Sequence, residues 1–243
     1  TPRSNRRQRQ MCIRDSVGVA ALYSALWWMG RRDTSLCVRD LWEIAITAGV
    51  IGLAAGRLVA MVRGGVNPLA HPGDLLLVRA GVDTVGATTA ALVTTAWLAR
   101  ADLREQLDGL APAALFGVAG WHAGCLLRDA CLGTPSELPW AWAQPGSDIT
   151  RHPVEIYAAI LLGVIAWLLF RLRLRYPAPG LVAALALAAA GAARLITEPM
   201  RPSLFGGPVW WYAAAIGIGL AVAAWTMITR ASSGTTDEAP PLQ

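Results

Sequence analysis

The chain has 243 residues, of which 55% are hydrophobic and only 15% charged, with a mean hydropathy of +0.44. Soluble domains carry about a quarter charged residues, so this composition excludes an ordinary soluble globular protein. The formal net charge is +5 and all 21 basic residues are arginine. Because these arginines lie in short segments between apolar runs, we do not interpret the basic charge as nucleic-acid binding.

The two ends of the chain differ from the rest. Residues 1–16 are polar and rich in arginine, and the sequence turns apolar abruptly at Val17. They lack the apolar stretch and small-residue cleavage site of a secretory signal peptide. We therefore expect residues 1–16 to be non-native or disordered, with the beginning of the first helix lost. Residues 231–243 are polar, and we expect a disordered tail.

Between these ends the apolar residues gather into runs that approach the length needed to cross a bilayer core of about 30 Å. The segments between the runs are rich in Pro, Gly and Arg, as loops are. Residues 17–230 are therefore predicted to form one all-α domain, a polytopic integral membrane helix bundle of about seven transmembrane helices. The expected spans are Val17–Gly30, Glu43–Val62, Gly81–Leu98, Leu110–Leu127, Val154–Phe170, Gly180–Ile196 and Val209–Ile228.

The distribution of arginine over the loops predicts the orientation. The loops after the first, third, fifth and seventh spans carry more arginine than the loops on the opposite side, and arginine-rich loops stay in the cytoplasm. We therefore expect a multi-pass protein of the bacterial plasma (inner) membrane, with the C-terminus in the cytoplasm and the long loop Arg128–Arg151 outside. The cytoplasmic set is Arg31, Arg32, Arg39, Arg100, Arg104, Arg171, Arg173, Arg175 and Arg230.

Several ionisable residues fall within or beside the apolar runs, namely Arg57, Asp83, His122 and Arg194. A charge near the bilayer centre costs about 2.5–3.5 kcal/mol on insertion scales, so such groups usually face the interior of a helix bundle.

The segment after Arg194 adds further charge. Glu198 follows Arg194 at the i,i+4 spacing, which allows the two charges to neutralise each other. Alternatively the arginines hold a lipid phosphate, together with Arg201, for which no carboxylate partner is evident.

His122 lies one helical turn before Cys125 and has three interpretations. It can be bonded to a neighbouring backbone carbonyl, or it can contact a head group or exchange protons, since imidazole titrates near neutral pH. A metal site built with Cys125, Cys131 and His152 matches no strong zinc spacing, so we expect no metal. The two cysteines themselves are explained by helix packing, by a disulfide or by metal ligation.

The segment Arg151–Pro153 leads directly into an apolar span that carries Glu155 and Tyr157. Trp140 and Trp142, just before it, suit a membrane–water interface. The segment therefore either consists of ordinary interfacial residues with no special function or binds a lipid head group.

Five stretches resemble the bacterial prolipoprotein diacylglyceryl transferases, in collinear order from Val17 to about Ile228. Gly133–Ala141 reads GTPSELPWA where the family has GRPTDLPWA, and Arg151–Ala158 reads RHPVEIYA where it has RHPSQLYE. The remaining matches are Arg194, Glu198 and Arg201 to R-x-x-x-E-x-x-R, Ala55–Arg57 to a GGR-type turn, and Asp108, Ala111 and Pro112 to D-x-x-A-P.

The resemblance implies an enzyme of lipoprotein biosynthesis that needs no cofactor. Such enzymes move the diacylglyceryl group of phosphatidylglycerol, a membrane lipid, onto the lipobox cysteine of a prolipoprotein signal peptide. The implied catalytic residues are Arg194, Glu198 and His122. The implied substrate-binding residues are Arg57, Arg128, Arg151, His152, Tyr157 and Arg201.

The chain departs from the family pattern G-R-x-G-N-F-x-N-x-E-x-x-G. When the two are aligned through Gly124 and Gly133, His122 stands for the arginine, Cys125 and Arg128 for the asparagines and Ala130 for the glutamate. Val85 stands where the family has a catalytic histidine in H-G-G. An active transferase and a divergent relative that only binds anionic lipid are therefore both open. A small membrane transporter is a third possibility, although no internal repeat is evident.

Overall fold

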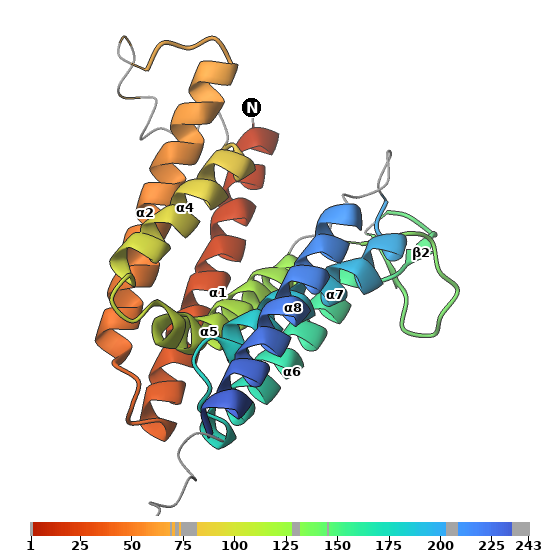
Figure 1. The fold of residues 1–243 in the computed structure, drawn as a ribbon. Coiled ribbons are helices and arrows are strands. Elements are labelled where there is room, and N and C mark those ends of the chain that lie inside the picture. Colours follow the sequence, from red (N-terminus) through yellow and green to blue (C-terminus); the bar gives the residue numbers. More distant parts are fainter. Residues whose placement is uncertain are drawn as a thin grey trace, which may run out of the picture. The chain divides into compact units, whose positions relative to one another are not determined.

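The computed structural model describes residues 2–68, 70, 73, 82–127, 132–144, 146–202 and 209–234. These residues form seven α-helices, two short 3-10 helices and one two-stranded antiparallel hairpin (Figure 1). The elements are α1 (Pro2–Arg32), α2 (Val38–Arg63), α4 (Thr84–Leu98), α5 (Leu103–Ala123), η1 (Gly124–Leu127), β1 (Trp142–Ala143), β2 (Thr150–Arg151), α6 (Val154–Arg175), α7 (Leu181–Thr197), η2 (Glu198–Met200) and α8 (Val209–Gly234).

The predicted all-α membrane architecture is confirmed, because each expected span overlaps one of these α-helices. Among the described residues, four helical stretches are long and apolar enough to cross a membrane: Val38–Arg63, Val154–Arg175, Leu181–Met200 and Val209–Ser232.

The helices extend beyond the expected spans at both ends of the chain. Residues 1–16 were expected to be non-native or disordered and residues 231–243 disordered. Of these stretches, Pro2–Ser16 is described as part of α1, and α8 runs on to Gly234. A helix that has already formed in an apolar span propagates readily into flanking Arg and Gln residues, which are good helix formers.

The chain divides into two compact units. The larger comprises residues 1–36 and 107–243, and therefore contains α1, most of α5 and the three helices α6, α7 and α8. The smaller comprises residues 37–106 and contains α2 and α4.

In the smaller unit, α2 and α4 approach closely at glycine, since a Cβ on Gly52 would lie 2.8 Å from the carbonyl oxygen of Ala87. Asp83, one of the ionisable residues within or beside the apolar runs, is the N-cap of α4. Its Oδ1 accepts a hydrogen bond from the Gly86 N–H at 2.7 Å, and its Oδ2 pairs with Arg63. A capping carboxylate satisfies a free N–H of the first helical turn, which gives Asp83 a structural role.

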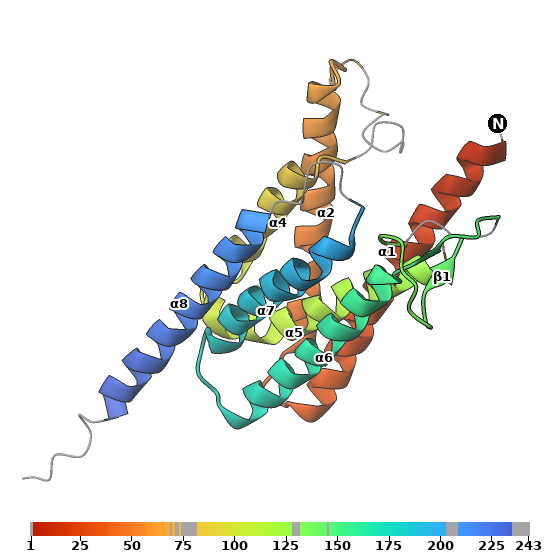
Figure 2. The ribbon, with the colours of Figure 1, turned by 90° about the vertical axis from the view of Figure 1, so that its right-hand side faces the viewer.

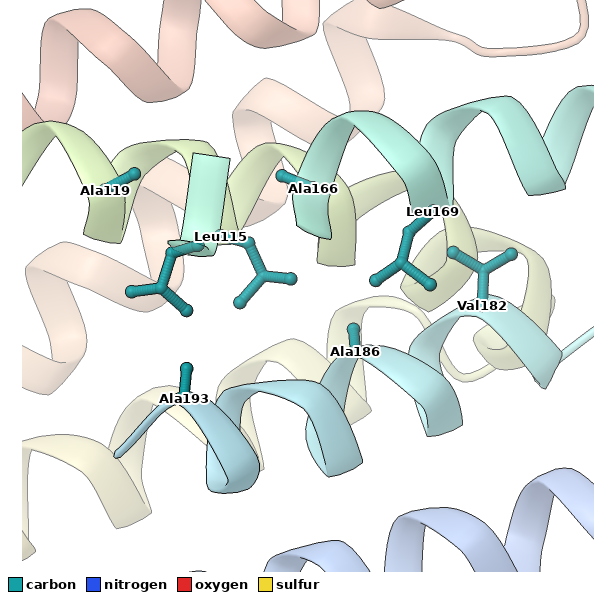
Figure 3. Packing of buried hydrophobic residues seen from close by; sticks show 8 residues of the cluster. Leu115, Ala119, Ala166, Leu169, Val182, Ala186 and Ala193 are labelled. Atoms are coloured by element: carbon teal, nitrogen blue, oxygen red, sulfur yellow. The ribbon is translucent and has the colours of Figure 1, made fainter. Parts of the chain in front are cut away.

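In the larger unit, α7 packs against both α6 and α8 (Figures 1 and 2). Figure 3 shows side chains of α5, α6 and α7 pointing toward one another across a core of alanine, leucine and valine. Helices in a bilayer gain no hydrophobic free energy by associating, so their association depends on close packing. Small side chains such as alanine allow that close approach. The core residues are Leu115, Ala119, Leu162, Ala166, Leu169, Val182, Ala186 and Ala193.

One buried carboxylate fixes α5 to the start of α7. Asp108 is 3% exposed, and it accepts hydrogen bonds from the N–H groups of Gly180 and Ala183, each at 2.7 Å. The first N–H groups of a helix have no partner within it, so Asp108 supplies acceptors from a neighbouring helix. The aspartate of the D-x-x-A-P stretch is thus a fold-determining residue.

Candidate functional site

Backbone hydrogen bonds join three segments at one end of the larger unit. The Gly133 N–H donates to the His152 carbonyl at 2.7 Å, and the Thr134 N–H donates to the Met200 carbonyl at 2.9 Å. Gly133 is buried, and a Cβ there would collide with the Met200 carbonyl and with Val154. The turn after α7 is therefore held against the segment that leads into α6, beside the β hairpin (Figure 1).

A bridging carboxylate, Glu155, lies in the first turn of α6 at this place. One of its oxygens contacts the Nδ1 of His122, in the last turn of α5, and the other accepts a hydrogen bond from the Arg201 Nη1 at 2.8 Å. His122 is only 2% exposed. A buried charge needs a partner and hydrogen bonds to be tolerated, and Glu155 receives both from segments distant in the sequence.

The structure shows two contacts in this cluster that the sequence did not indicate. Of the interpretations left open for His122, the structure shows a carboxylate contact and not one with a neighbouring backbone carbonyl, and Arg201, for which no carboxylate partner was evident, has one. Both are satisfied by Glu155, a residue 33 positions after His122 and 46 before Arg201. Local sequence spacing does not reveal contacts across such separations.

Four polar atoms beside this cluster are buried and have no hydrogen-bond partner within the described residues. They are the Nε and Nη2 of Arg201, the Nδ1 of His152 and the Oε2 of Glu198. Buried polar groups are nearly always hydrogen-bonded, so each such atom calls for an explanation. A guanidinium with two free N–H groups matches two oxygens of a phosphate in a bidentate contact.

Arg194 is partly buried and contacts α8 within the larger unit. Its Nη2 donates to the hydroxyl of Tyr212 on α8 at 3.3 Å, and its guanidinium lies 5.5 Å from the centre of the Tyr212 ring. The mutual neutralisation of Arg194 and Glu198 that the i,i+4 spacing allowed is absent between these two described side chains. Glu198 instead begins η2 and is 9% exposed.

The other expected substrate-binding residues of this region lie on the adjoining turn. The Arg151 Nη1 donates to the Gly133 carbonyl at 3.2 Å. The Tyr157 hydroxyl accepts a hydrogen bond from the Trp140 Nε1 at 2.7 Å, and the Tyr157 and His152 rings meet edge to face with centres 6.2 Å apart.

Two expected substrate-binding residues lie outside the described part of the larger unit. Arg57 lies on α2, in the smaller unit, and Arg128 lies outside the described residues. Cys125 is buried and disulfide-bonded, one of the three explanations considered for it. No group of three or more His, Cys, Asp or Glu side chains in the described part of the chain is arranged to hold a metal ion.

Sequence reasoning gave no role to two residues of the site, Glu155 and Tyr212. Glu155 carries a detectable signal, because a carboxylate in the first turn of an apolar span is costly unless it is paired. Tyr212 lies at the start of α8 after two tryptophans. Aromatic residues at the end of a span are common at membrane–water interfaces, so the sequence alone does not indicate that Tyr212 contacts Arg194.

Comparison with known proteins bears directly on this site. The family model described as prolipoprotein diacylglyceryl transferase matches residues 16–207. A phosphatidylglycerol–prolipoprotein diacylglyceryl transferase of Methylocella silvestris is 32% identical over 203 residues, which cover 75% of this chain and 72% of the relative.

Two further relatives carry the same name. The one from Bordetella bronchiseptica is 28% identical over 234 residues, or 90% of this chain and 85% of the relative. The one from Glaesserella parasuis is 31% identical over 126 residues, or 50% of this chain and 47% of the relative.

The family match includes the whole cluster, from His122 through Glu155 to Arg201. It agrees with the apolar helices of a membrane protein. The chain therefore belongs to the prolipoprotein diacylglyceryl transferase family, a family of transferases.

Proposed function

We propose that this chain transfers the diacylglyceryl group of phosphatidylglycerol to the lipobox cysteine of a prolipoprotein. The observation that carries the proposal is the buried guanidinium of Arg201, which Glu155 holds in place while its Nε and Nη2 have no partner within the described residues. We place the protein in the bacterial plasma membrane with its C-terminus in the cytoplasm, as the arginine distribution predicts.

In the proposed reaction the thiolate sulfur attacks the glycerol carbon that carries the phosphate. The new S–C bond forms as the C–O bond breaks, and the electron pair leaves with glycerol phosphate. Negative charge gathers on the departing phosphate, so fixed positive charge there lowers the barrier. Arg201 supplies it through two parallel N–H groups, with Arg194 as the second cation.

The thiol must first lose its proton, because the thiolate is the nucleophile. In our proposal His122 accepts this proton and passes it to the glycerol phosphate as that group leaves. Glu155 holds the imidazole ring in a fixed orientation, as a carboxylate does for the histidine of a catalytic triad.

The remaining site residues are proposed to position the substrates. Glu198 has a buried, unpartnered oxygen within the described part of the chain, and it suits a hydroxyl of the head-group glycerol. Arg151, His152 and Tyr157 border the same region through the hairpin contacts. Arg57 and Arg128 remain proposed lipid-binding residues on the strength of the resemblance alone.

One observation favours a second candidate, a relative that binds anionic lipid without transferring it. Val85 stands where the family pattern has a catalytic histidine, and it is 68% exposed on the first turn of α4. In the transferase proposal the His122–Glu155 pair carries out the proton transfer that a histidine at position 85 would otherwise perform. In the lipid-binding alternative no residue carries out this proton transfer, and the lipid stays intact.

Expression in cells depleted of their own transferase separates these candidates. A reporter prolipoprotein that gains the diacylglyceryl mass in mass spectrometry supports transfer. Replacing Arg201 with alanine should lower the yield roughly 100- to 1,000-fold, the usual effect of removing one charge-stabilising donor. Arg39→Ala is the matched control, because the Arg39 side chain is 85% exposed. An unmodified reporter beside normally inserted protein that retains phosphatidylglycerol would establish the binding-only relative.

A further inference from the structure

The end of the larger unit opposite the candidate site carries a second group of arginines. Helix α6 has 22 residues and is therefore about 33 Å long, close to the hydrocarbon thickness of a bilayer. Glu155 lies in its first turn, and Arg173 and Arg175 lie in its last. A helix of this length and composition can reach both membrane surfaces, one with each end.

Helices α1 and α6 are fastened together at this second end. The Arg173 Nε donates to the Oδ2 of Asp33, just after α1, at 3.1 Å. The rings of Trp28 and Phe170 meet with their centres 5.0 Å apart. These contacts place Arg31 and Arg32, the last residues of α1, close to the end of α6.

Three exposed arginines at this end, Arg31, Arg32 and Arg171, each lie over a tryptophan one helical turn earlier. The guanidinium carbon of Arg31 is 3.8 Å from the centre of the Trp27 ring, and that of Arg171 is 4.9 Å from the Trp167 ring. Trp27 and Trp167 are 48% and 41% exposed. Exposed tryptophans of membrane helices lie at the level of the lipid head groups, so the stacked guanidinium groups lie there too.

Within the described residues of the larger unit, the arginines at this end outnumber the carboxylates. The carboxylates that the structure describes here in the larger unit are Asp33 and Asp108. The first is bonded to Arg173 and Ser35, and the second to the start of α7. Arg31 and Arg171 make no ion pair with any carboxylate in the described ranges.

We propose that Arg31, Arg32 and Arg171, with Trp27 and Trp167, bind the phosphate of an anionic phospholipid in the leaflet opposite the transfer site. The arginines supply forked N–H donors that match phosphate oxygens, while the indole rings hold the guanidinium groups in place by cation–π contact. Anionic lipid of the cytoplasmic leaflet is attracted to basic clusters of this kind. No step of the proposed transfer uses this site.

The test measures lipid binding without any transferase readout. The full chain carrying Arg201→Gln, which weakens the proposed transfer site equally in every sample, is titrated in detergent with dioleoylphosphatidylglycerol or dioleoylphosphatidylcholine. Native mass spectrometry counts the bound lipids. Adding Arg31→Gln and Arg171→Gln should weaken phosphatidylglycerol binding about tenfold or more, since each change removes charge-assisted hydrogen bonds. Arg39→Gln should leave binding unchanged.

A second pair of changes, Arg31→Lys and Arg171→Lys, keeps the positive charge but removes the planar guanidinium group that can form two parallel hydrogen bonds to a phosphate. Phosphate recognition predicts that these lysine variants also bind phosphatidylglycerol more weakly than the parent, by at least threefold. Equal binding by parent, glutamine and lysine variants would overturn the proposal, and so would equal binding of phosphatidylcholine by the parent. The arginines would then act only in membrane orientation, and the proposed transfer reaction would be unaffected.

Discussion

Glu155 bridges His122 and a cation with its two carboxylate oxygens, and in doing so it connects the end of α5 to the turn after α7. The bridging residue is neither one of the matched family positions nor one of the residues expected from the sequence to do chemistry. It nevertheless determines where the neighbouring groups point. The arrangement makes Glu155 a positioning residue for both His122 and Arg201.

Replacing Glu155 with glutamine should reduce diacylglyceryl transfer by roughly 10- to 100-fold, the usual effect of losing a residue that orients reacting groups. The amide keeps the size of the side chain but removes the charge that pairs with Arg201. The pH dependence of transfer should change together with the rate, because Glu155 acts through His122. The yield of modified reporter is measured between pH 6 and 9.

The control for this change is Glu137→Gln, since Glu137 lies on the hairpin segment before β1 rather than in the buried cluster. A Glu155→Gln enzyme with an unaltered rate and pH profile would show that the carboxylate only helps the fold.

The fold was largely predictable from the sequence, because hydropathy acts locally. Apolar runs such as Val209–Ile228 must be helical in a bilayer to satisfy their own backbone, and α8 covers this run. The helix ends were less predictable, since Arg175 can continue a helix with its charged end outside the apolar layer.

The site was only partly predictable. The matched motif singled out Arg194, Glu198 and Arg201, but it said nothing about their partners. An i,i+4 spacing permits contact between Arg194 and Glu198, yet it cannot show that the hydroxyl of Tyr212 is also within reach of Arg194. Partners that come from another helix depend on packing, which one sequence does not reveal.

Asp108 should contribute more to stability than to chemistry. Changing it to alanine leaves the N–H groups of Gly180 and Ala183 without their buried acceptor, which should cost about 1–3 kcal/mol and lower the unfolding temperature in detergent. Asp108→Asn should cost less, because one oxygen remains to accept a hydrogen bond.

Asp148→Ala is the comparison for this experiment, since Asp148 is exposed between β1 and β2. Similar unfolding temperatures for the Asp108 and Asp148 variants would contradict the capping role.

Gly133→Ala should disrupt the candidate site through sterics alone. A Cβ at Gly133 would meet the Met200 carbonyl and the Val154 side chain too closely for any real contact, so η2 or the start of α6 must move. We expect a loss of about 1–3 kcal/mol from overpacking and a larger fall in transfer than stability alone explains. Urea titration and the reporter assay measure the two effects.

Gly163→Ala on α6 serves as the matched control, because a Cβ there would meet nothing within 4 Å. It should be neutral or stabilising by about 0.5–1 kcal/mol, as expected when alanine replaces glycine in a helix. Retention of full transfer in Gly133→Ala would show that the site tolerates a shift of η2.

The contact between α1 and α6 should weaken in acid. Asp33 is partly buried, which by itself raises the pKa of its carboxyl, but hydrogen bonds from Ser35 and Arg173 outweigh burial and hold the pKa below its ordinary value of 3.8. The carboxylate is therefore more stable in the folded protein than in the unfolded chain. Its contribution is fully present above pH 3.8 and is lost as the pH falls through the lower folded pKa.

Thermal unfolding in detergent, followed at pH 6 and at pH 3, measures this effect. The difference between the parent and Asp33→Asn should be present at pH 6 and should shrink at pH 3, where the parent carboxyl begins to gain a proton. A second variant, Asp40→Asn, controls for general acid effects, because Asp40 is exposed in the first turn of α2. If the stability difference between parent and Asp33→Asn were the same at both pH values, the ion pair with Arg173 would not be what fastens α1 to α6.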